Sequence, residues 1–268
     1  MDNSPIGVFD SGIGGLSVLR ALRAEMPHEH FIYIADSGHA PYGERDLAHV
    51  LTRSRAIVQY LVSQKVKALV IACNTATAAA IHLLRAEHPG LVLIGVEPAL
   101  KPAARLSQTG RIGVMATRST LASVKFRALL DAQAGHASFV LQPCDGLAAA
   151  IEHSAETGDT SRTIALCESY TGAMGSFGPK NNQIDTLVLG CTHYPFASVH
   201  LRALLGPDVR IIDNGEAIAR QTRRLVQTSL PESDQQPGQV SLFTTGQPQT
   251  LQAAAKRWLG LSAQVNLL

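Results

Sequence analysis

The two halves of the chain repeat one pattern, and this repeat constrains the fold more than any single motif does. Ile6–Val8 (IGV) recurs as Ile112–Val114, and each copy is followed by a turn and a helix-like segment that contains Arg-Ala-Leu. Further along, Lys67–Thr75 (KALVIACNT) aligns with Asp185–His193 (DTLVLGCTH), which superimposes one cysteine of each half on the other. The sequence therefore predicts two related domains with cysteines at equivalent places.

Short apolar runs alternate with helix-like segments along both halves. Phe31–Ala35 (FIYIA) and Leu91–Val96 (LVLIGV) are almost entirely apolar, as expected for strands of a sheet that is covered on both faces. Alternation of such strands with helices favours parallel sheets with right-handed crossovers. We therefore expect an α/β fold with two pseudo-symmetric, open parallel-sheet domains that face each other across an active-site cleft.

The composition excludes several classes of protein. Hydrophobic residues make up 46% of the chain and charged residues 16%, which indicates a globular protein with a substantial core. The net charge of +2 and the lack of a dense Lys/Arg run argue against nucleic-acid binding. No apolar run approaches the roughly 20 residues of a membrane helix, and the start of the chain lacks the features of a secretion signal. We expect a cytoplasmic protein.

The two aligned cysteines, Cys73 and Cys191, each follow the carboxyl end of an apolar strand and precede a helix. Ligands of open α/β sheets bind beyond these strand ends. The N-terminus of a helix favours a thiolate there, because its partial positive charge lowers the pKa of a thiol from about 8.5. Cys144 and Cys167 have no counterpart in the repeat, so we expect them to be structural.

Two equivalent thiols suit the inversion of an α-carbon. One group removes a proton from one side of the carbon, and the other returns a proton to the opposite side. Because racemisation runs in both directions, each group must be a base for one enantiomer and an acid for the other, which favours a pKa near the operating pH. The pair Cys73 and Cys191 therefore predicts a racemase.

Short polar side chains surround the expected helix starts. Such groups can hold a substrate carboxylate and spread the charge of a developing carbanion. The candidates are Ser11, Asn74, Thr75, Thr117, Thr120, Thr192 and His193. His193 is also suited to adjusting the protonation of the Cys191 thiol. Asp10 is suited to the same role beside Cys73. For Ser11 and Thr120, ordinary N-capping explains the residue equally well.

The loop Asp10–Gly15 (DSGIGG) follows the first strand and is similar to a phosphate-binding loop. It does not fit the dinucleotide pattern G-x-G-x-x-G, and the chain has no G-x-x-x-x-G-K-[ST] motif. Its glycines instead allow the backbone to approach a small anion closely. The loop therefore predicts no nucleotide cofactor.

Four motifs in order resemble the aspartate/glutamate racemase family, and within it the glutamate racemases of bacterial cell-wall synthesis. They are VFDSGIGGLSV from Val8, APYG at Ala40–Gly43, ACNTATA at Ala72–Ala78 and GCTHYP at Gly190–Pro195. The resemblance covers residues 6 to 227. It implies an isomerase that interconverts L- and D-glutamate without pyridoxal phosphate or metal and supplies D-glutamate for peptidoglycan.

The resemblance also implies roles for individual residues. Cys73 and Cys191 match the two proton-transferring thiols, and Asp10 and His193 match auxiliary residues beside them. The implied substrate contacts are Asp10, Ser11, Tyr42, Gly43, Asn74, Thr75, Thr192 and His193. Glu152, in a looser motif, falls near an acidic residue of the family and is implied as a further substrate contact. The family fold implies a discontinuous first domain, residues 1–97 and 208–268, around a second domain of residues 98–207.

Glutamate is the small-molecule partner that the resemblance implies, with no nucleic acid and no membrane. A homodimer is left open, because members of the family differ in how they dimerise. A muropeptide-precursor effector is also left open. Some proteobacterial relatives carry a longer N-terminal extension linked to such activation, whereas this chain has only a few residues before its first predicted strand.

Three other functions remain open at this point. A racemase for another acidic amino acid, such as aspartate, would use the same two thiols. A hydrolase with Cys191 as its nucleophile and His193 as its base would leave Cys73 and the repeat unexplained, and it predicts that Cys73→Ser retains activity. A non-catalytic module that binds a small anion at the glycine loop predicts binding without sensitivity to thiol reagents.

Overall fold

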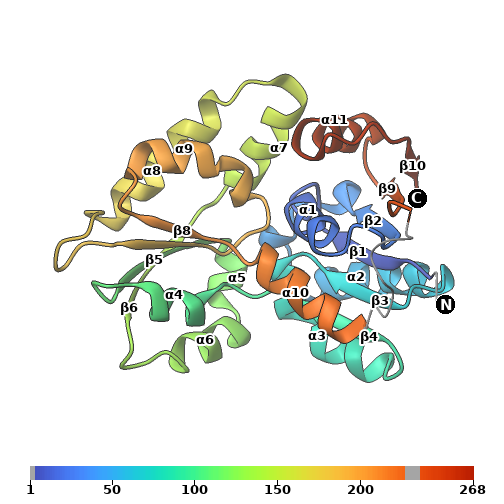
Figure 1. Ribbon diagram of the computed structural model, residues 1–268, viewed down its shortest axis with the longest axis horizontal. Coiled ribbons are helices and arrows are strands. Elements are labelled where there is room, and N and C mark those ends of the chain that lie inside the picture. The colour runs from blue at the N-terminus through green and yellow to red at the C-terminus, as the bar shows by residue number, and fades with distance from the viewer. Residues whose placement is uncertain (1–3, 227–235) are drawn as a thin grey trace. The chain divides into compact units, whose positions relative to one another are not determined.

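The computed structural model describes residues 4–226 and 236–268, which form two compact units (Figure 1). The first unit contains the described residues up to Val96 and those from Gly215 onward, and the second runs from Glu97 to Asn214. Each unit has its own sheet, and every strand pair in both sheets is parallel. The predicted α/β class with two parallel sheets is confirmed.

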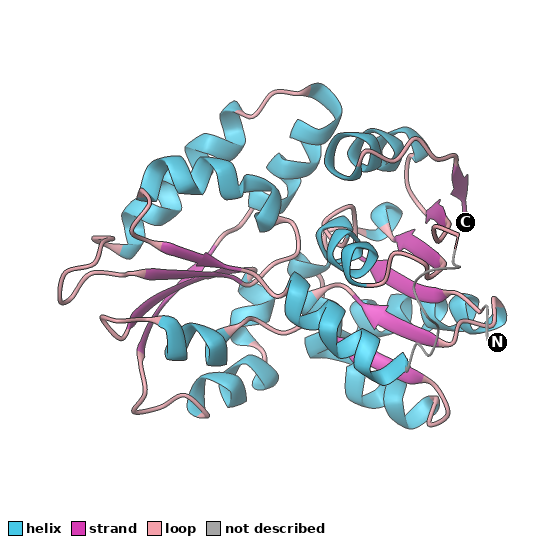
Figure 2. Cartoon of the chain, in the orientation of Figure 1, coloured by secondary structure: helices cyan, strands magenta, loops and turns pink. Residues whose placement is uncertain are grey.

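The first unit is built on a sheet with the strand order β10-β9-β2-β1-β3-β4 (Figure 2). Its strands are β1 (Ile6–Asp10), β2 (Phe31–Ala35), β3 (Ala68–Ile71), β4 (Val92–Gly95), β9 (Val240–Thr244) and β10 (Val265–Leu267). Its helices are α1 (Leu16–Glu25), α2 (Leu47–Ser63), α3 (Asn74–Glu87), α10 (Gly215–Val226) and α11 (Pro248–Leu259), with short 3-10 turns η1 (Ser37–His39) and η2 (Tyr42–Glu44). The first three strands are completely buried because helices cover the sheet.

The second unit is built on a smaller sheet with the order β6-β5-β7-β8. Its strands are β5 (Arg111–Ala116), β6 (Ser138–Pro143), β7 (Thr186–Leu189) and β8 (Arg210–Ile212). Its helices are α4 (Leu100–Leu106), α5 (Arg118–Ala122), α6 (Val124–Asp131), α7 (Leu147–Thr157), α8 (Ser161–Met174) and α9 (Ser198–Leu205), with a 3-10 turn η3 (Tyr194–Ala197).

The chain returns from the second unit to the first at a later residue than the sequence predicts. The sequence prediction assigned residues 208–268 to the first domain, but β8 pairs with β7 in the second sheet. The chain enters the first unit again only at Gly215. An apolar run predicts a strand without specifying which sheet the strand joins, because pairing depends on residues far away in the sequence.

The internal repeat is present in the strand register. In the first unit β1 pairs with β3 so that Ile6 lies beside Ala68, and in the second β5 pairs with β7 so that Ile112 lies beside Thr186. The order β2-β1-β3-β4 therefore corresponds strand by strand to β6-β5-β7-β8. The aligned sequence segments occupy equivalent strands.

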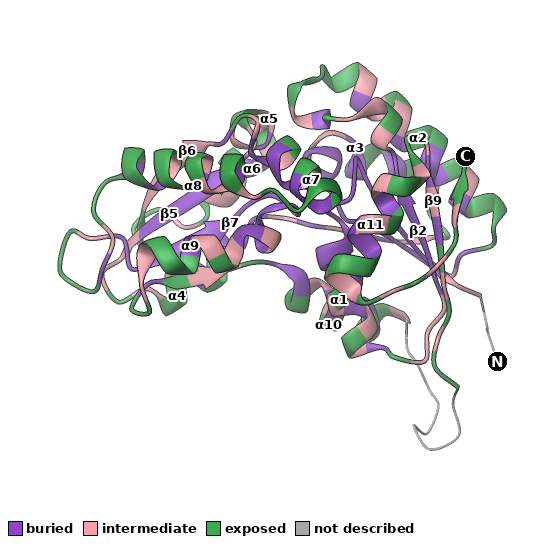
Figure 3. Cartoon of the chain, turned by 90° about the horizontal axis from the view of Figure 1, so that it is seen from above, coloured by how far each residue is buried: buried purple, intermediate pink, exposed green. Residues whose placement is uncertain are grey.

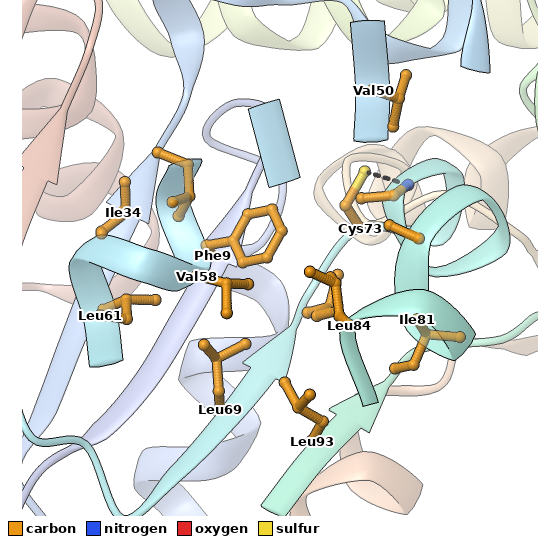
Figure 4. Close-up of a cluster of buried hydrophobic side chains, with 14 of the residues drawn as sticks. Phe9, Ile34, Val50, Val58, Leu61, Leu69, Cys73, Ile81, Leu84 and Leu93 are labelled. Atoms are coloured by element: carbon orange, nitrogen blue, oxygen red, sulfur yellow. Dashed lines mark hydrogen bonds between the residues drawn. The ribbon is translucent and has the colours of Figure 1, made fainter. Parts of the chain in front are cut away.

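A cluster of buried apolar side chains lies between the first sheet and its helices (Figure 4). Phe9 and Leu69 from the sheet pack with Leu61 of α2 and Leu84 of α3. Cys73 belongs to this cluster and lies at the carboxyl end of the strands. Figure 3 shows that buried residues concentrate in the strands, while the outer faces of the helices are exposed. Within residues 4–226 and 236–268, no helix combines the length and hydropathy needed to span a membrane.

Candidate active site

Cys73 and Cys191 occupy equivalent positions in the two units. In each unit, the residue before the cysteine extends the sheet by donating its backbone N–H to the neighbouring strand, over 2.7 Å in both cases. The cysteine then leaves the sheet at its carboxyl end. The two side chains are 5% and 8% exposed, so both thiols are largely shielded from bulk water. The predicted alignment of the two cysteines agrees with this geometry.

The Cys73 thiol lies at the start of α3, where it is the N-cap residue. Its sulfur accepts the backbone N–H of Ala76 at 3.5 Å, the contact drawn as a dashed line in Figure 4. The thiol also donates to Ser11 Oγ at 3.6 Å. A helix N-terminus stabilises negative charge. Cys73 is therefore held at a helix N-terminus and beside a hydroxyl group that accepts a hydrogen bond from its thiol.

Asp10 is completely buried at the end of β1. Its carboxylate accepts the backbone N–H of Ser11 at 2.7 Å and that of Gly15 at 2.5 Å, and it accepts the Ser11 hydroxyl at 3.3 Å. A side chain at Gly15 would meet the Asp10 Cβ at 2.7 Å, so this approach requires glycine. Two backbone N–H groups of the glycine loop, which was predicted to bind an anion, therefore bind the carboxylate of Asp10 instead. Ser11 connects Asp10 to Cys73 and is not an N-cap.

Asn74 carries the clearest sign of a binding position for a polar ligand. It is 6% exposed, and neither its side-chain nitrogen nor its side-chain oxygen has a hydrogen-bond partner among the described residues. Leaving a buried amide unsatisfied costs free energy, so native proteins rarely do it without a ligand. Asn74 follows Cys73 directly, and Thr75 beside it is also buried. The site next to Cys73 is therefore suited to a small polar molecule.

Tyr42 begins the turn η2, which also contains Gly43. The ring is buried, and its hydroxyl donates to Asp36 Oδ2 at 2.5 Å. Burial and the adjacent Asp36 carboxylate raise the pKa of Tyr42 far above its usual value, so the phenol remains a donor. The sequence analysis did not identify Asp36. The available signal was its position directly after an apolar strand, close to the place of Asp10 as the last residue of β1.

The surroundings of Cys191 contain a linked His and Glu. Cys191 Sγ lies 3.7 Å from His193 Nδ1, and His193 Nε2 lies 2.8 Å from Glu152 Oε1. Burial alone would lower the pKa of His193, but its hydrogen bonds to Cys191 and Glu152 outweigh burial and raise the pKa well above 6.5. This geometry favours an imidazolium beside the sulfur. Glu152, expected among the substrate contacts, touches His193.

The threonines of the second unit fall into two groups. Thr117 is the N-cap of α5, since its hydroxyl oxygen accepts the Thr120 backbone N–H at 3.2 Å and its hydroxyl donates to Thr120 Oγ1 at 2.9 Å. Thr120 is therefore not the cap itself. Thr192, which lies between Cys191 and His193 in the sequence, is buried.

The sequence analysis missed Tyr194. This residue is fully buried, and its hydroxyl donates to the Cys144 backbone carbonyl at 3.3 Å.

The chemistry available at these residues is proton transfer by sulfur and recognition by short polar groups. Each unit supplies one thiol with a neighbouring group that affects its charge: the Asp10–Ser11 pair beside Cys73 and the His193–Glu152 pair beside Cys191. In the part of the chain that the structure describes, no group of three or more His, Cys, Asp or Glu side chains is arranged to hold a metal ion.

Known proteins match this chain over nearly its whole length. The family model described as Asp/Glu/Hydantoin racemase matches residues 16–222. Glutamate racemase of Ectopseudomonas mendocina is 45% identical and covers 98% of each chain, and that of Pseudomonas paraeruginosa is 43% identical over 94% of this chain and 92% of the other. The solved glutamate racemase of Bacillus anthracis superimposes with a TM-score of 0.85 at 32% identity, covering 99% of this chain and 97% of the other.

This chain has two parallel-sheet units of matching strand order. Each unit has a cysteine at the end of the equivalent strand. The chain belongs to the Asp/Glu/Hydantoin racemase family. It is an amino-acid racemase, and the similarity of its motifs to those of the glutamate racemases is confirmed.

The remaining two cysteines have environments unlike those of a proton-transferring thiol. Burial raises the pKa of Cys144 well above its usual range and the pKa of Cys167 to about 11. Because such thiols stay protonated near neutral pH, we expect Cys144→Ala and Cys167→Ala to keep kcat within about threefold of the unmodified enzyme. Steady-state racemisation rates on folded variants measure this. A loss above about tenfold in either folded variant would contradict a structural role.

Proposed function

We propose that this racemase interconverts L- and D-glutamate by transferring the α-proton between two cysteine thiols, and that it supplies D-glutamate for peptidoglycan synthesis. The observation that carries the proposal is the equivalence of Cys73 and Cys191, each at the carboxyl end of the same strand in a repeated sheet. A reaction that runs equally in both directions needs two groups with interchangeable roles, and a repeat supplies them.

The proton balance needs no further reactant. The thiolate of one cysteine takes the α-proton, and the thiol of the other gives its own proton to the opposite side of the carbanion. The α-carbon is inverted, and the two cysteines have exchanged protonation states. The reverse reaction, or proton exchange with water, restores the starting state. The chemistry therefore requires the two thiols to reach one α-carbon from opposite sides.

The polar residues bind the amino acid and stabilise the carbanion in this proposal. The amide of Asn74, which has no partner among the described residues, offers its oxygen as an acceptor to the substrate ammonium group and its N–H as a donor to the carboxylate. Ser11, Tyr42, Gly43, Thr75, Thr117, Thr120 and Thr192 are proposed as further contacts. The N-termini of α3 and α5 place backbone N–H groups and partial positive charge beside them.

The auxiliary residues act through the thiols. His193, held by Glu152, stabilises the Cys191 thiolate as an ion pair and can return a proton to it. Asp10 accepts the Ser11 hydroxyl, which leaves the Ser11 oxygen to accept the hydrogen bond of the Cys73 thiol. We assign Glu152 to the support of His193 because its carboxylate contacts the imidazole. The two thiols are thus equivalent in position and unlike in their electrostatic surroundings.

Glutamate is supported as the substrate by relatives that were solved with it. The glutamate racemase of Escherichia coli, with a TM-score of 0.84 and 29% identity, was solved with L-glutamate and the activator UDP-MurNAc-ala. That of Francisella tularensis, with a TM-score of 0.82 and 25% identity, was solved with D-glutamate. Whether this enzyme responds to such an activator is a question for the same assay that tests the substrate.

Loss of optical activity tests the proposal directly. Desalted enzyme without pyridoxal phosphate or added metal is mixed with L-glutamate and followed by circular dichroism, and we expect the signal to decay to zero. A flat trace with L-glutamate but decay with L-aspartate would replace glutamate as the substrate. A flat trace with both amino acids, with and without UDP-MurNAc-ala, would overturn the proposed function.

A further inference from the structure

Asp36 is a buried carboxylate for which the proposed proton transfer has no use. It is completely buried and directly follows β2. Its backbone N–H donates to the Asp10 carbonyl at 2.9 Å, which places it at the same sheet edge as Cys73. Burying a carboxylate is costly unless it is paired and hydrogen-bonded. The groups that pair with Asp36 therefore indicate what it holds in place.

Both carboxylate oxygens of Asp36 are fully engaged. Oδ2 accepts the Tyr42 hydroxyl at 2.5 Å and Arg53 Nε at 3.0 Å, while Oδ1 accepts Arg53 Nη2 at 2.9 Å and Thr245 Oγ1 at 2.8 Å. The bidentate ion pair with Arg53 is the geometry that best neutralises a buried carboxylate. Because each oxygen already accepts two hydrogen bonds, Asp36 is suited to holding its neighbours and unsuited to proton transfer.

The neighbours of Asp36 come from three separate parts of the first unit. Tyr42 begins η2, Arg53 lies on α2, and Thr245 follows β9. The turn η2 packs against α3, the helix that starts beside Cys73. Burial, the Asp36 carboxylate and, to a lesser degree, Cys73 raise the pKa of Tyr42 far above its usual value. Asp36 thus anchors a turn that borders the site.

The second unit provides an internal comparison. Cys144 follows β6 as Asp36 follows β2, and its backbone N–H donates to Ala116 O at 3.0 Å. There Tyr194 donates to the Cys144 backbone carbonyl at 3.3 Å. Both units therefore anchor a tyrosine at this position, but the second does so without a carboxylate. The repeated strand arrangement does not itself require an acidic side chain here, so the ion pair of the first unit has another role.

We propose that Asp36, held by Arg53 and Thr245, is a positioning residue of the racemase that sets substrate affinity by fixing Tyr42 and the turn that carries Gly43. This inference rests on the proposed function, in which that turn contacts glutamate. Asp36 acts through Tyr42 and touches neither the substrate nor a thiol. Its loss therefore weakens binding more than it slows proton transfer.

Two single substitutions separate binding from chemistry. Tyr42→Phe keeps the ring and removes only the hydroxyl that Asp36 accepts, and we expect KM for L-glutamate to rise about fivefold with kcat within about threefold. Asp36→Asn removes the charge that holds both Tyr42 and Arg53, so KM should rise by about tenfold or more, with kcat again changing less than KM. Initial rates over a range of glutamate concentrations give both constants.

A double-mutant cycle identifies the contact itself. Tyr42→Phe and Asp36→Asn disrupt the same hydrogen bond, so the double variant should raise KM by clearly less than the product of the two single effects. Arg55→Gln is the matched control, because Arg55 lies on the same helix and pairs with Glu87 at the surface, with side chains 48% and 35% exposed. We expect Arg55→Gln to leave KM unchanged.

The outcomes distinguish this inference from the proposed function. Unmodified enzyme that does not racemise glutamate would overturn the proposed function before any variant is made. Unmodified enzyme that does racemise it, while folded Tyr42→Phe keeps the original KM, would overturn the positioning role alone. Multiplicative effects in the cycle would also overturn it. If Asp36→Asn does not fold, Thr245→Val replaces it, because that change removes one hydrogen bond to Asp36 and keeps the ion pair.

Discussion

Replacing either Cys73 or Cys191 by serine should lower kcat for glutamate racemisation by about a thousandfold or more. A serine hydroxyl is a far weaker acid than a thiol, so it does not supply the base for one enantiomer or the readily released proton for the other. Both substitutions should be equally severe, because each direction of the reaction uses both groups. Measurement of kcat in both directions by circular dichroism tests this, with Cys144→Ala as the control for loss of a buried thiol.

The single-thiol variants should also differ from each other in a defined way. In the proposed mechanism each variant keeps one sulfur base, which reaches the α-proton of only one enantiomer. In D₂O, Cys73→Ser and Cys191→Ser should therefore exchange the α-hydrogen of opposite enantiomers, as followed by proton NMR. Full racemisation by Cys73→Ser would instead favour a single catalytic cysteine. Exchange of the same enantiomer by both variants would contradict the assignment of the thiols to opposite sides of the substrate.

Replacing His193 by asparagine should lower kcat by about a hundredfold. The imidazole lies 3.7 Å from Cys191 Sγ, and its hydrogen bond with that sulfur helps to raise the pKa of His193. Asparagine retains a polar group without the positive charge, so the thiolate loses its counter-ion. Glu152→Gln should have a smaller effect and lower kcat about tenfold. This variant keeps a hydrogen bond to His193 and removes only the negative charge of the carboxylate. Steady-state kinetics of both variants test this order.

The pH dependence of stability follows from the raised pKa of His193. A histidine whose pKa is higher in the folded protein than in the unfolded chain stabilises the fold fully below its unfolded value of about 6.5. That stabilisation is lost as the pH rises through the folded pKa, which the contacts with Cys191 and Glu152 raise well above 6.5 despite burial. The advantage of unmodified enzyme over His193→Asn should therefore be larger at pH about 6 than at pH about 9.5.

Urea unfolding of both proteins at the two pH values measures this difference. His153→Asn is the matched control, because His153 is adjacent to Glu152 on α7 and exposed. Its kcat and its pH dependence of stability should match those of the unmodified enzyme. An advantage of unmodified enzyme over His193→Asn that stays constant or grows toward high pH would show that the imidazolium is not favoured in the folded state.

Much of the fold could be predicted because it depends on local patterns. The run Phe31–Ala35 forms β2 with the predicted bounds, and Leu91–Val96 forms the slightly shorter β4. The repeat correctly aligned the strands that precede the two cysteines. Apolar runs specify buried strands by composition alone, and a duplicated segment keeps its register. The roles of the individual site residues stay predictions until the variants are measured.

By itself, the sequence determined the two parallel sheets, the equivalence of Cys73 and Cys191, and the polar residues that follow them. The tertiary structure alone decided the contacts between distant side chains. It joined Glu152 to His193 across 41 residues and Asp36 to Thr245 across 209, and it placed β8 in the second sheet. Hydrophobic periodicity reports which face of a strand or helix is buried, whereas these contacts depend on strand order and on helix packing, which bring together residues that no local pattern relates.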